Sequence, residues 1–358
     1  MEVVGIPLTK TVNVGLLGTG FILDTMHLPV YNLLGESVNV VAVGGREEGK
    51  VESFRKRWGI KKGYHGPNCI DKLCSDADVE VVDVSIPNDL HLDAIRSASE
   101  NHKHVICEKP LARNGVEATE ALELVRRNGV LHCYAENQLF IPQIAKARQI
   151  IRDGTLGKIT WIRSREAHSG PHSRWFYDRN RAGGGVLLDM GCHSIEVARK
   201  LLASKPIAVN AWTATLFHHI ESEDNSLVLV KYDDGALSQC ENSWTAKGGL
   251  DIRLEVYGTE GSIFIDVTRD TGMRLFVSGS GETTGHIVEK ADVNRGWMFP
   301  VTSEGYSYGY FDELRHFLNC IRDGTSPSET FEDGRTVNLI MDKAYESSKS
   351  PDKWEQLG

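Results

Sequence analysis

The sequence predicts an α/β protein in which a doubly wound parallel sheet is followed by an α+β domain with an open, mainly antiparallel sheet. Three observations predict this fold. The first third of the chain alternates β-branched apolar runs with amphipathic stretches, a glycine-rich turn follows the first run, and closely spaced strands dominate after about residue 136. With 358 residues the chain is long enough for two domains, which we place at residues 1–136 and 137–358.

Short runs rich in valine and isoleucine predict buried strands in the first domain. They cover residues 12–17, 38–43, 79–86, 104–107 and 130–135. Amphipathic helices are predicted between them at 47–58, 90–100 and 115–128. Strands that alternate with helices imply parallel strands joined by right-handed crossovers, and hence a doubly wound sheet.

The second domain has a different pattern. Helices are expected at residues 144–152 and 186–202, the second directly after three glycines, and at 310–322 and 333–347, where Asp333 is the expected cap. Strands are expected at 158–166, 207–217, 226–232, 236–244, 252–257, 262–266 and 273–277. One face of such an open sheet needs cover, so we expect a partner subunit on this sheet.

Composition excludes several classes of partner. The formal net charge is -9 with no clustered basic face, which argues against nucleic acid and anionic membranes. The seven cysteines are scattered without metal spacing, which favours reduced thiols and no metal site. Residues 1–10 lack the apolar stretch of a signal peptide, and no apolar run is long enough to span a bilayer. We therefore expect a cytoplasmic protein.

The first predicted strand runs directly into the turn Gly18-Thr19-Gly20-Phe21-Ile22-Leu23. Its glycines, Gly18 and Gly20, let the backbone approach a pyrophosphate, and the following helix offers its N-terminal N–H groups and dipole. Phe21 and Ile22 belong to the same turn. Leu23 replaces the third glycine of the usual fingerprint, a position that normally allows close packing of helix and strand. At the start of a βαβ unit, the turn predicts a dinucleotide site of the Rossmann type.

The end of the second strand bears on the choice of cofactor. NAD-binding domains usually carry an acidic residue here, whereas this chain has Gly45 followed by Arg46. A small residue leaves room for a 2′-phosphate, and a guanidinium can pair with it, so NADP is slightly favoured over NAD. Alternatively, Arg46 stacks on the adenine of either cofactor or faces water, and Glu47 or Glu48 reaches the ribose.

Hydride transfer from an alcohol requires a group that takes the hydroxyl proton, and two segments supply candidates. Glu108-Lys109-Pro110 follows the strand 104–107 at the edge where such sheets bind ligands, and Lys109 can polarise the reacting oxygen; a surface turn is the alternative. In a helix over 186–202, Asp189 and His193 share one face at i and i+4. The carboxylate can orient the imidazole for proton transfer, the alternative being a surface ion pair.

Taken together, these motifs resemble those of the glucose–fructose oxidoreductase / inositol dehydrogenase (Gfo/Idh/MocA) family. The resemblance covers nearly the whole chain, including Asp333-Gly334 before the last helix. The matching segments are Gly18-Thr19-Gly20, Ser85-Ile86-Pro87-Asn88-Asp89-Leu90-His91, Cys107-Glu108-Lys109-Pro110, and Gly183-Gly184-Gly185 followed by Asp189-Met190-Gly191-Cys192-His193.

The resemblance implies roles for individual residues. Lys109 would assist proton transfer and position the substrate oxygen, His193 would be the acid/base, and Asp189 would bind substrate hydroxyls. Glu108 would lie near the nicotinamide ribose. Around the cofactor the family pattern places Pro87, Asn88 and His91. The family implies dimers or tetramers formed through the open sheet, and no metal.

A short segment before the glycine run is rich in aromatic and hydrogen-bonding side chains. It contains Arg165, His168 and Trp175, which suit the wall of a pocket for a polyhydroxylated ring. The alternative is an interface or surface loop.

The sequence thus predicts an NAD(P)-dependent oxidoreductase that transfers a hydride between nicotinamide and a secondary alcohol or ketone carbon of a sugar, glycoside or cyclitol. Two alternatives stay open. The first is the same chemistry on another substrate, such as a dihydrodiol, an amino-sugar intermediate or a tetrapyrrole. The second is a non-catalytic NAD(P)-binding regulator, which would not need both Lys109 and His193.

Overall fold

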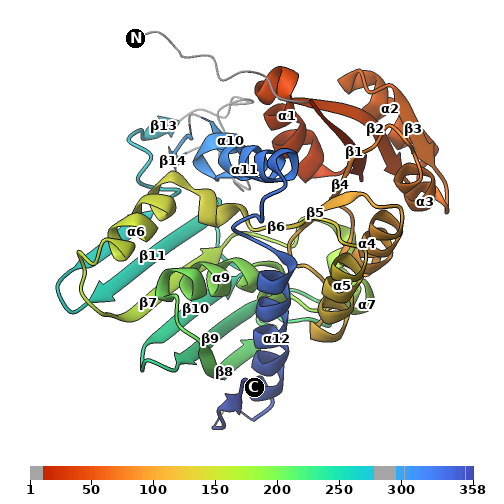
Figure 1. The fold of residues 1–358 in the computed structure, drawn as a ribbon. Coiled ribbons are helices and arrows are strands. Elements are labelled where there is room, and N and C mark those ends of the chain that lie inside the picture. The colour runs from red at the N-terminus through yellow and green to blue at the C-terminus, as the bar shows by residue number, and fades with distance from the viewer. Residues whose placement is uncertain (1–10, 278–295, 302, 351) are drawn as a thin grey trace. The chain divides into compact units, whose positions relative to one another are not determined.

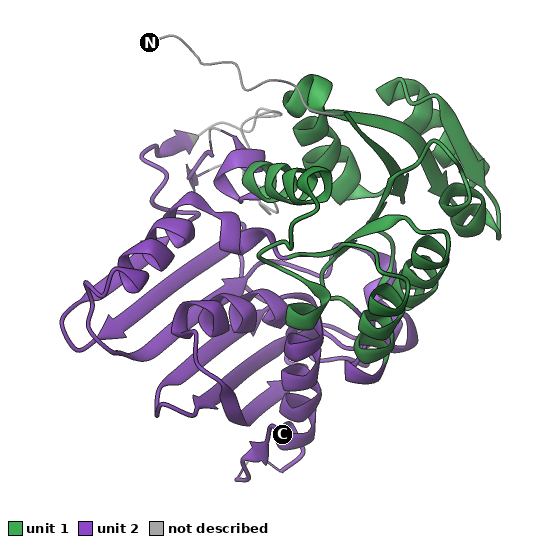
Figure 2. Cartoon of the chain, viewed as in Figure 1, with its two compact units in different colours: residues 1–111, 117–135, 310–334 green, residues 112–116, 136–309, 335–358 purple. Residues whose placement is uncertain are grey.

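The chain folds into two units, and the computed structural model describes residues 11–277, 296–301, 303–350 and 352–358. Unit 1 contains residues 1–111, 117–135 and 310–334, and unit 2 contains residues 112–116, 136–309 and 335–358 (Figure 2). The N-terminal segment 1–10, used above for the prediction about a signal peptide, lies outside the described residues.

Unit 1 is built on a six-stranded sheet in which every neighbouring pair is parallel. The strand order is β3-β2-β1-β4-β5-β6. The chain adds strands on one side of β1 and then, from β4 on, on its other side, as in a dinucleotide-binding sheet. The strands are β1 (Val12–Leu17), β2 (Val38–Gly45), β3 (Lys62–His65), β4 (Val81–Val84), β5 (His104–Glu108) and β6 (His132–Ala135). The predicted doubly wound sheet is confirmed.

The helices of the first part of the chain cover this sheet. They are α1 (Leu28–Leu34), α2 (Glu48–Trp58), α3 (Cys69–Cys74), α4 (His91–Glu100) and α5 (Gly115–Arg127), of which α5 lies largely in unit 1. Helix α11 (Tyr310–Asp323) also belongs to unit 1. The sequence did not indicate β3, because Lys62-Gly63-Tyr64-His65 is a short, half-buried edge strand without β-branched residues.

Unit 2 contains a seven-stranded sheet of order β12-β11-β7-β10-β9-β8-β15. Only β7 and β10 pair in parallel among its strands, so the sheet is mainly antiparallel, as predicted. The strands are β7 (Ile159–Ala167), β8 (Pro206–Ala214), β9 (Asn225–Tyr232), β10 (Leu237–Ser243), β11 (Asp251–Gly258), β12 (Ser262–Asp266) and β15 (Glu355–Gln356). A separate ribbon pairs β13 (Leu275–Val277) with β14 (Gly296–Met298).

One face of this sheet is covered by α9 (Gly191–Leu202), which packs across β7 and β10 (Figure 1). Strand β7 shows the alternation that results, since Ile162, Ser164 and Glu166 are buried whereas Arg163 is exposed. The other helices that lie wholly or mainly in unit 2 are α6 (Pro142–Arg152), α7 (Arg179–Ala182), α8 (Val186–Asp189), α10 (Glu304–Ser307) and α12 (Phe331–Ser348).

Two local expectations were wrong. The single helix expected over 186–202 is broken at Met190, so Asp189 ends α8 and His193 lies in the first turn of α9. Asp333 does not precede the last helix but lies in its first turn, where its carboxylate accepts a hydrogen bond from the Thr330 N–H at 3.0 Å.

Candidate active site

The glycine-rich turn of unit 1 has the backbone that a diphosphate site requires. Gly18 has φ +119°, and a Cβ there would lie 2.4 Å from the carbonyl oxygen of Ser85, so only glycine fits. Beside Gly20 the space is open, because an added Cβ would meet no atom within 4 Å. Phe21 is half exposed at 53%. The turn therefore offers an approachable backbone just before a helix, which suits the pyrophosphate of a dinucleotide.

Leu23, the residue that departs from the glycine fingerprint, begins a short π-helical turn, Leu23–His27, ahead of α1. Its side chain is fully buried. A buried side chain thus stands where other dinucleotide folds carry glycine, and the turn ends at His27, which is also fully buried.

His27 joins the ends of two central strands of unit 1. Its Nδ1 lies 2.7 Å from Asp83 Oδ2 on β4, and its Nε2 lies 3.1 Å from Glu108 Oε1 at the end of β5. The Tyr31 hydroxyl donates to the same Asp83 oxygen at 2.7 Å. Burial alone would lower the pKa of His27, but the Asp83 and Glu108 carboxylates outweigh it and hold that pKa well above its usual value. The sequence suggested neither His27 nor Asp83 as part of a site.

The segment around Lys109 is tied down by its neighbours. The Lys109 N–H donates to Glu108 Oε2 at 3.1 Å. The ring of His91 is buried, with Nε2 2.8 Å from the Ile86 carbonyl and Nδ1 3.1 Å from the Pro110 carbonyl. Burial lowers the pKa of His91, which favours the neutral ring. His91 thus joins the loops after β4 and β5, while Asn88 is buried and Pro87 half-buried in the first of these loops.

The end of β2 holds the residues used to predict cofactor preference. Gly45 is half-buried, and an added Cβ would lie 3.0 Å from Val51 Cγ2. Arg46 is exposed.

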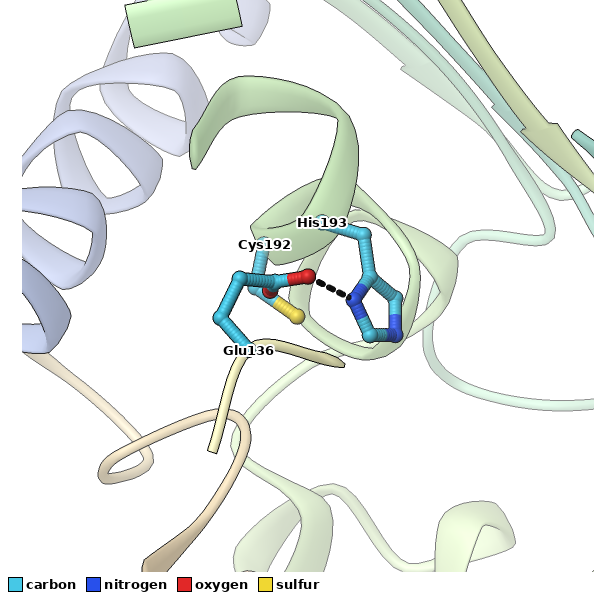
Figure 3. A group of neighbouring side chains, drawn as sticks. All are labelled: Glu136, Cys192 and His193. Carbon is cyan, nitrogen blue, oxygen red and sulfur yellow. Dashed lines mark hydrogen bonds and ion pairs between the residues drawn. The ribbon is translucent and has the colours of Figure 1, made fainter. Parts of the chain in front are cut away.

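In unit 2, His193 meets a carboxylate that the sequence did not suggest as its partner. Its Nδ1 lies 2.6 Å from Glu136 Oε1, and Figure 3 shows the carboxylate directed at this nitrogen. Glu136 is 0% exposed and His193 is 6% exposed. Cys192 completes the group, with its Sγ donating to the Asp189 carbonyl oxygen at 3.2 Å.

Asp189 is held in place from two directions. Its Oδ2 accepts a hydrogen bond from the indole Nε1 of the fully buried Trp244 at 3.1 Å. The start of its helix is fixed by Glu223, whose Oε1 accepts from the N–H groups of Gly185 and Leu187 at 3.0 Å each. A Cβ on Gly185 would lie 2.0 Å from the Glu223 carbonyl oxygen, so the last glycine of the run is needed for this close approach.

The aromatic segment before the glycine run gathers around Trp244. Trp175 stacks on Phe176 with centroids 3.8 Å apart, and Phe176 meets Trp244 edge-on at 5.6 Å. His168, which is 1% exposed, stacks on His172, and its Nδ1 lies 3.0 Å from the Nε2 of that ring. These contacts lead from Trp175 through Phe176 to the Trp244 ring that holds Asp189. His168 lies beside the same strand end, where its N–H donates to the Ser243 carbonyl oxygen at 2.9 Å.

Arg165 lies elsewhere. It belongs to the face of β7 opposite α9, where its Nε donates to Asp251 Oδ2 at 3.1 Å and its guanidinium also pairs with Glu241. An ion-pair network therefore holds Arg165 on the open face of the sheet, whereas α9, which carries His193, lies on the opposite face.

Known proteins resemble both parts of the chain. Residues 12–136 match a family described as an oxidoreductase family with an NAD-binding Rossmann fold, and residues 144–264 match the GFO/IDH/MocA C-terminal domain. The chain belongs to the Gfo/Idh/MocA family of oxidoreductases.

Individual relatives align over most of their length. The chain is 28% identical to the levoglucosan dehydrogenase of Pseudarthrobacter phenanthrenivorans, over 95% of this chain and 96% of that protein. It is 30% identical to the scyllo-inositol 2-dehydrogenase (NAD(+)) of Bacillus subtilis, over 86% of each. Among solved structures, that of GenD2 from gentamicin A biosynthesis in complex with NAD superimposes with a TM-score of 0.91 at 26% identity, covering 100% of this chain and 99% of that chain.

The family membership confirms the predicted resemblance and the predicted enzyme class. The protein is a nicotinamide-dependent dehydrogenase or reductase whose first part is an NAD-binding Rossmann domain. Within the described residues, no helix is both long and apolar enough to cross a membrane.

Glu136 is the main residue that the sequence prediction left out. It directly follows the predicted strand 130–135, at the carboxyl end where doubly wound sheets place functional side chains. That position was the available signal. Its contact with His193 joins residues 57 positions apart, which no local pattern encodes.

Proposed function

We propose that this dehydrogenase oxidises a secondary alcohol carbon of a sugar, glycoside or cyclitol, or reduces the corresponding ketone. The observation that carries the proposal is the group at the break between α8 and α9. There, Asp189 is held by Trp244 beside stacked aromatic rings, and His193 opens the next helix. Carboxylate, imidazole and aromatic faces together suit a hydroxyl-rich ring. The names of the levoglucosan and scyllo-inositol dehydrogenases support this substrate class.

In the oxidative direction the substrate loses a hydride from carbon and a proton from oxygen. A bound nicotinamide supplies the hydride acceptor, and the residues around the diphosphate turn of unit 1 would hold it. His193 takes the hydroxyl proton, Lys109 positions and polarises the same oxygen, and Asp189 binds a neighbouring hydroxyl. His168 and Trp175 line the substrate. In reduction, His193 returns the proton to the alkoxide oxygen.

For the cofactor we propose a modest preference for NADP over NAD. The support is the small Gly45 and the exposed Arg46 at the end of β2, where a 2′-phosphate would need space and a cation. The relatives whose names or complexes specify NAD support the opposite preference. Parallel fluorescence titrations with NADH and NADPH decide between them, and tighter binding of NADH would contradict the proposed preference.

We further propose that the open face of the unit 2 sheet is covered by a second copy of the chain. This face exposes Trp161 on β7, Trp212 on β8 and Phe264 on β12 among charged residues. Such a mixed, twisted surface suits an interface between identical sheets.

All seven cysteines are buried thiols, which agrees with the expected reducing, cytoplasmic location.

Turnover of defined substrates tests the proposed function. The purified protein is mixed with NAD+ or NADP+ and a panel of aldoses, 1,6-anhydrosugars, inositols and one trans-dihydrodiol, and nicotinamide absorbance is followed. We expect reduction of the cofactor with at least one polyol. Turnover of the dihydrodiol alone would replace the sugar assignment, and cofactor binding without turnover of any alcohol would favour a regulator.

A further inference from the structure

We propose that Glu136 is a positioning residue for proton transfer, holding the His193 ring by Nδ1 so that Nε2 exchanges the proton with substrate. This inference rests on the proposed function, in which His193 is the acid/base. It adds a residue to the site that lies outside the motifs by which the family was recognised.

The contact is short, buried and well directed. Glu136 Oε1 lies 2.6 Å from His193 Nδ1, and the carboxylate is shielded completely from solvent. Figure 3 shows Nε2 on the side of the ring turned away from the carboxylate. A charge-assisted hydrogen bond of this length in a dry environment fixes both the ring plane and the tautomer.

The carboxylate is itself mounted rigidly. Glu136 caps the short 3-10 helix η4 (Asn137–Phe140) by accepting from the Gln138 N–H at 3.3 Å. The Gln138 side chain then donates to Glu166 Oε2 on β7 at 2.6 Å. The Asn137 side chain donates to the Tyr308 carbonyl at 2.7 Å. Three consecutive buried polar residues therefore tie this loop to the body of unit 2.

The chemistry follows from where the protons lie. Because a carboxylate only accepts, the proton of the neutral ring stays on Nδ1 and the lone pair is on Nε2. When substrate is oxidised, its O–H proton passes to Nε2 and the Nδ1 proton remains in the hydrogen bond, while a bound nicotinamide would accept the hydride that leaves carbon. The adjacent carboxylate then stabilises the imidazolium that forms.

Other titratable groups lie close to Glu136 and His193 in sequence or through hydrogen-bonded neighbours. Asp189 ends α8 and Cys192 precedes His193. Glu166 on β7 accepts from the Gln138 side chain, and Cys240 on β10 donates to the Ser194 carbonyl oxygen at 3.4 Å. A ligand atom each from Glu136, Cys192 and His193 lies within 4.8 Å of the others, so the competing role for this group is a metal site.

The test compares three single variants of the full-length enzyme. Glu136→Gln keeps the shape and an acceptor for Nδ1 but removes the charge, and Glu136→Asp keeps the charge but shortens its reach. Glu196→Gln is the control: Glu196 is a buried carboxylate of the same helix that pairs with Arg199 at 2.6 Å. Measured are kcat, KM, NAD(P)H affinity, the pH profile and the thermal transition.

We expect Glu136→Gln to lower kcat about 10- to 100-fold, the usual effect of losing an orienting partner. KM and NAD(P)H affinity should each change by less than about twofold, because Glu136 contacts neither substrate nor cofactor in the proposed site. The acid limb of the pH profile should move to lower pH, because the imidazolium loses its stabilising anion. Glu136→Asp should recover part of kcat, and Glu196→Gln should lose stability but keep kcat.

Several outcomes overturn the inference. An unchanged kcat and pH profile in Glu136→Gln would do so, and so would equal loss of kcat in Glu196→Gln. Activity that is lost with a chelator and restored by Zn²⁺ would assign the group to a metal.

A second measurement does not depend on the substrate. In protein with 15N-labelled histidine, NMR should show the His193 ring protonated at Nδ1, and Glu136→Gln should shift its titration to lower pH. If the wild type turns over no alcohol but shows this tautomer, the proposed function fails while the positioning contact stands. If the neutral ring is protonated at Nε2 instead, the inference fails whatever the substrate.

Discussion

Each unit buries a histidine against carboxylates, and the two arrangements differ in a way that separates structural from chemical roles. In unit 1 both nitrogens of His27 meet carboxylates, Asp83 at 2.7 Å and Glu108 at 3.1 Å. In unit 2 Glu136 meets the Nδ1 edge of His193, and we assign the Nε2 edge to substrate.

His27 and His193 also differ in burial and in the charges around them. His27 is fully buried, and its two acidic neighbours hold its pKa well above the usual value, so it stays charged near neutral pH. A cation fixed between two strand ends joins β4 to β5, and carboxylates hold both of its ring nitrogens. His193 retains some exposure, 6%, and the Glu136 carboxylate meets its ring at Nδ1. A histidine–carboxylate contact alone therefore does not mark an acid/base, because a ring whose two nitrogens are both held by carboxylates, as in His27, is suited to a structural role.

The largest effect is expected from His27→Gln, which tests whether His27 stabilises unit 1 as a cation between Asp83 and Glu108. It removes the cation between two buried carboxylates, so unit 1 should lose about 3–5 kcal/mol of stability. Tyr31→Phe is the graded control, because it removes one hydrogen bond to Asp83 and should cost about 1 kcal/mol. Thermal unfolding of wild type and variants measures both effects.

The same residue predicts a pH dependence. Because the folded-state pKa of His27 is raised above its unfolded value, its contribution is complete below about pH 6.5 and is lost as pH rises through the folded pKa. The stability gap between wild type and His27→Gln should therefore shrink on going to alkaline pH. A gap that widens with pH would show that His27 is neutral in the folded protein.

Gly18→Ala probes the cofactor turn that precedes His27. A Cβ at φ +119°, 2.4 Å from the Ser85 carbonyl oxygen, forces the backbone to move. We expect NAD(P)H affinity to fall about tenfold or more, equivalent to about 1.4 kcal/mol. Gly49→Ala, at an exposed position in α2 outside the turn, is the matched control, since an added Cβ there meets no atom within 4 Å. An equal loss of affinity in Gly49→Ala would mean that the effect of Gly18→Ala does not arise from the contact with Ser85.

The smallest effect is expected from Trp244→Phe, which tests the support of Asp189 in the site of unit 2. This change removes the Nε1–H that holds Asp189 but keeps a ring against Phe176. Loss of one such hydrogen bond is worth about 1 kcal/mol, so KM for the polyol should rise about fivefold. Affinity for NAD(P)H should stay constant. A fall in kcat with unchanged KM would instead place Asp189 in proton transfer.

Local signals in the sequence were sufficient for much of the fold. The runs at 12–17 and 38–43 became β1 and β2 because valine-rich, continuously apolar segments suit buried parallel strands. The turn at Gly18 was predictable because its constraint is local. The break at Met190 was missed because apolar residues continue at helical spacing on both sides of it. The start of α8 is also held by Glu223, a distant residue that no local pattern indicates.

The partners of the site histidines were beyond local reasoning for the same reason. His27 contacts carboxylates 56 and 81 positions away, and His193 contacts one 57 positions away. The motifs supplied Glu108, Asp189 and His193, but only the folded chain brings each to its neighbour. Arg165 shows the opposite error: composition placed it in a pocket wall, while strand alternation directs it to the other face of β7.

The most direct test of the central claim is to compare wild type with His193→Ala for polyol turnover and for NAD(P)H binding in the same preparation. If His193 is the acid/base, turnover should fall by about 10²- to 10⁴-fold while cofactor affinity and the thermal transition stay close to wild type. Full activity in His193→Ala would contradict the assignment of His193, and with it the distinction drawn between the two buried histidines.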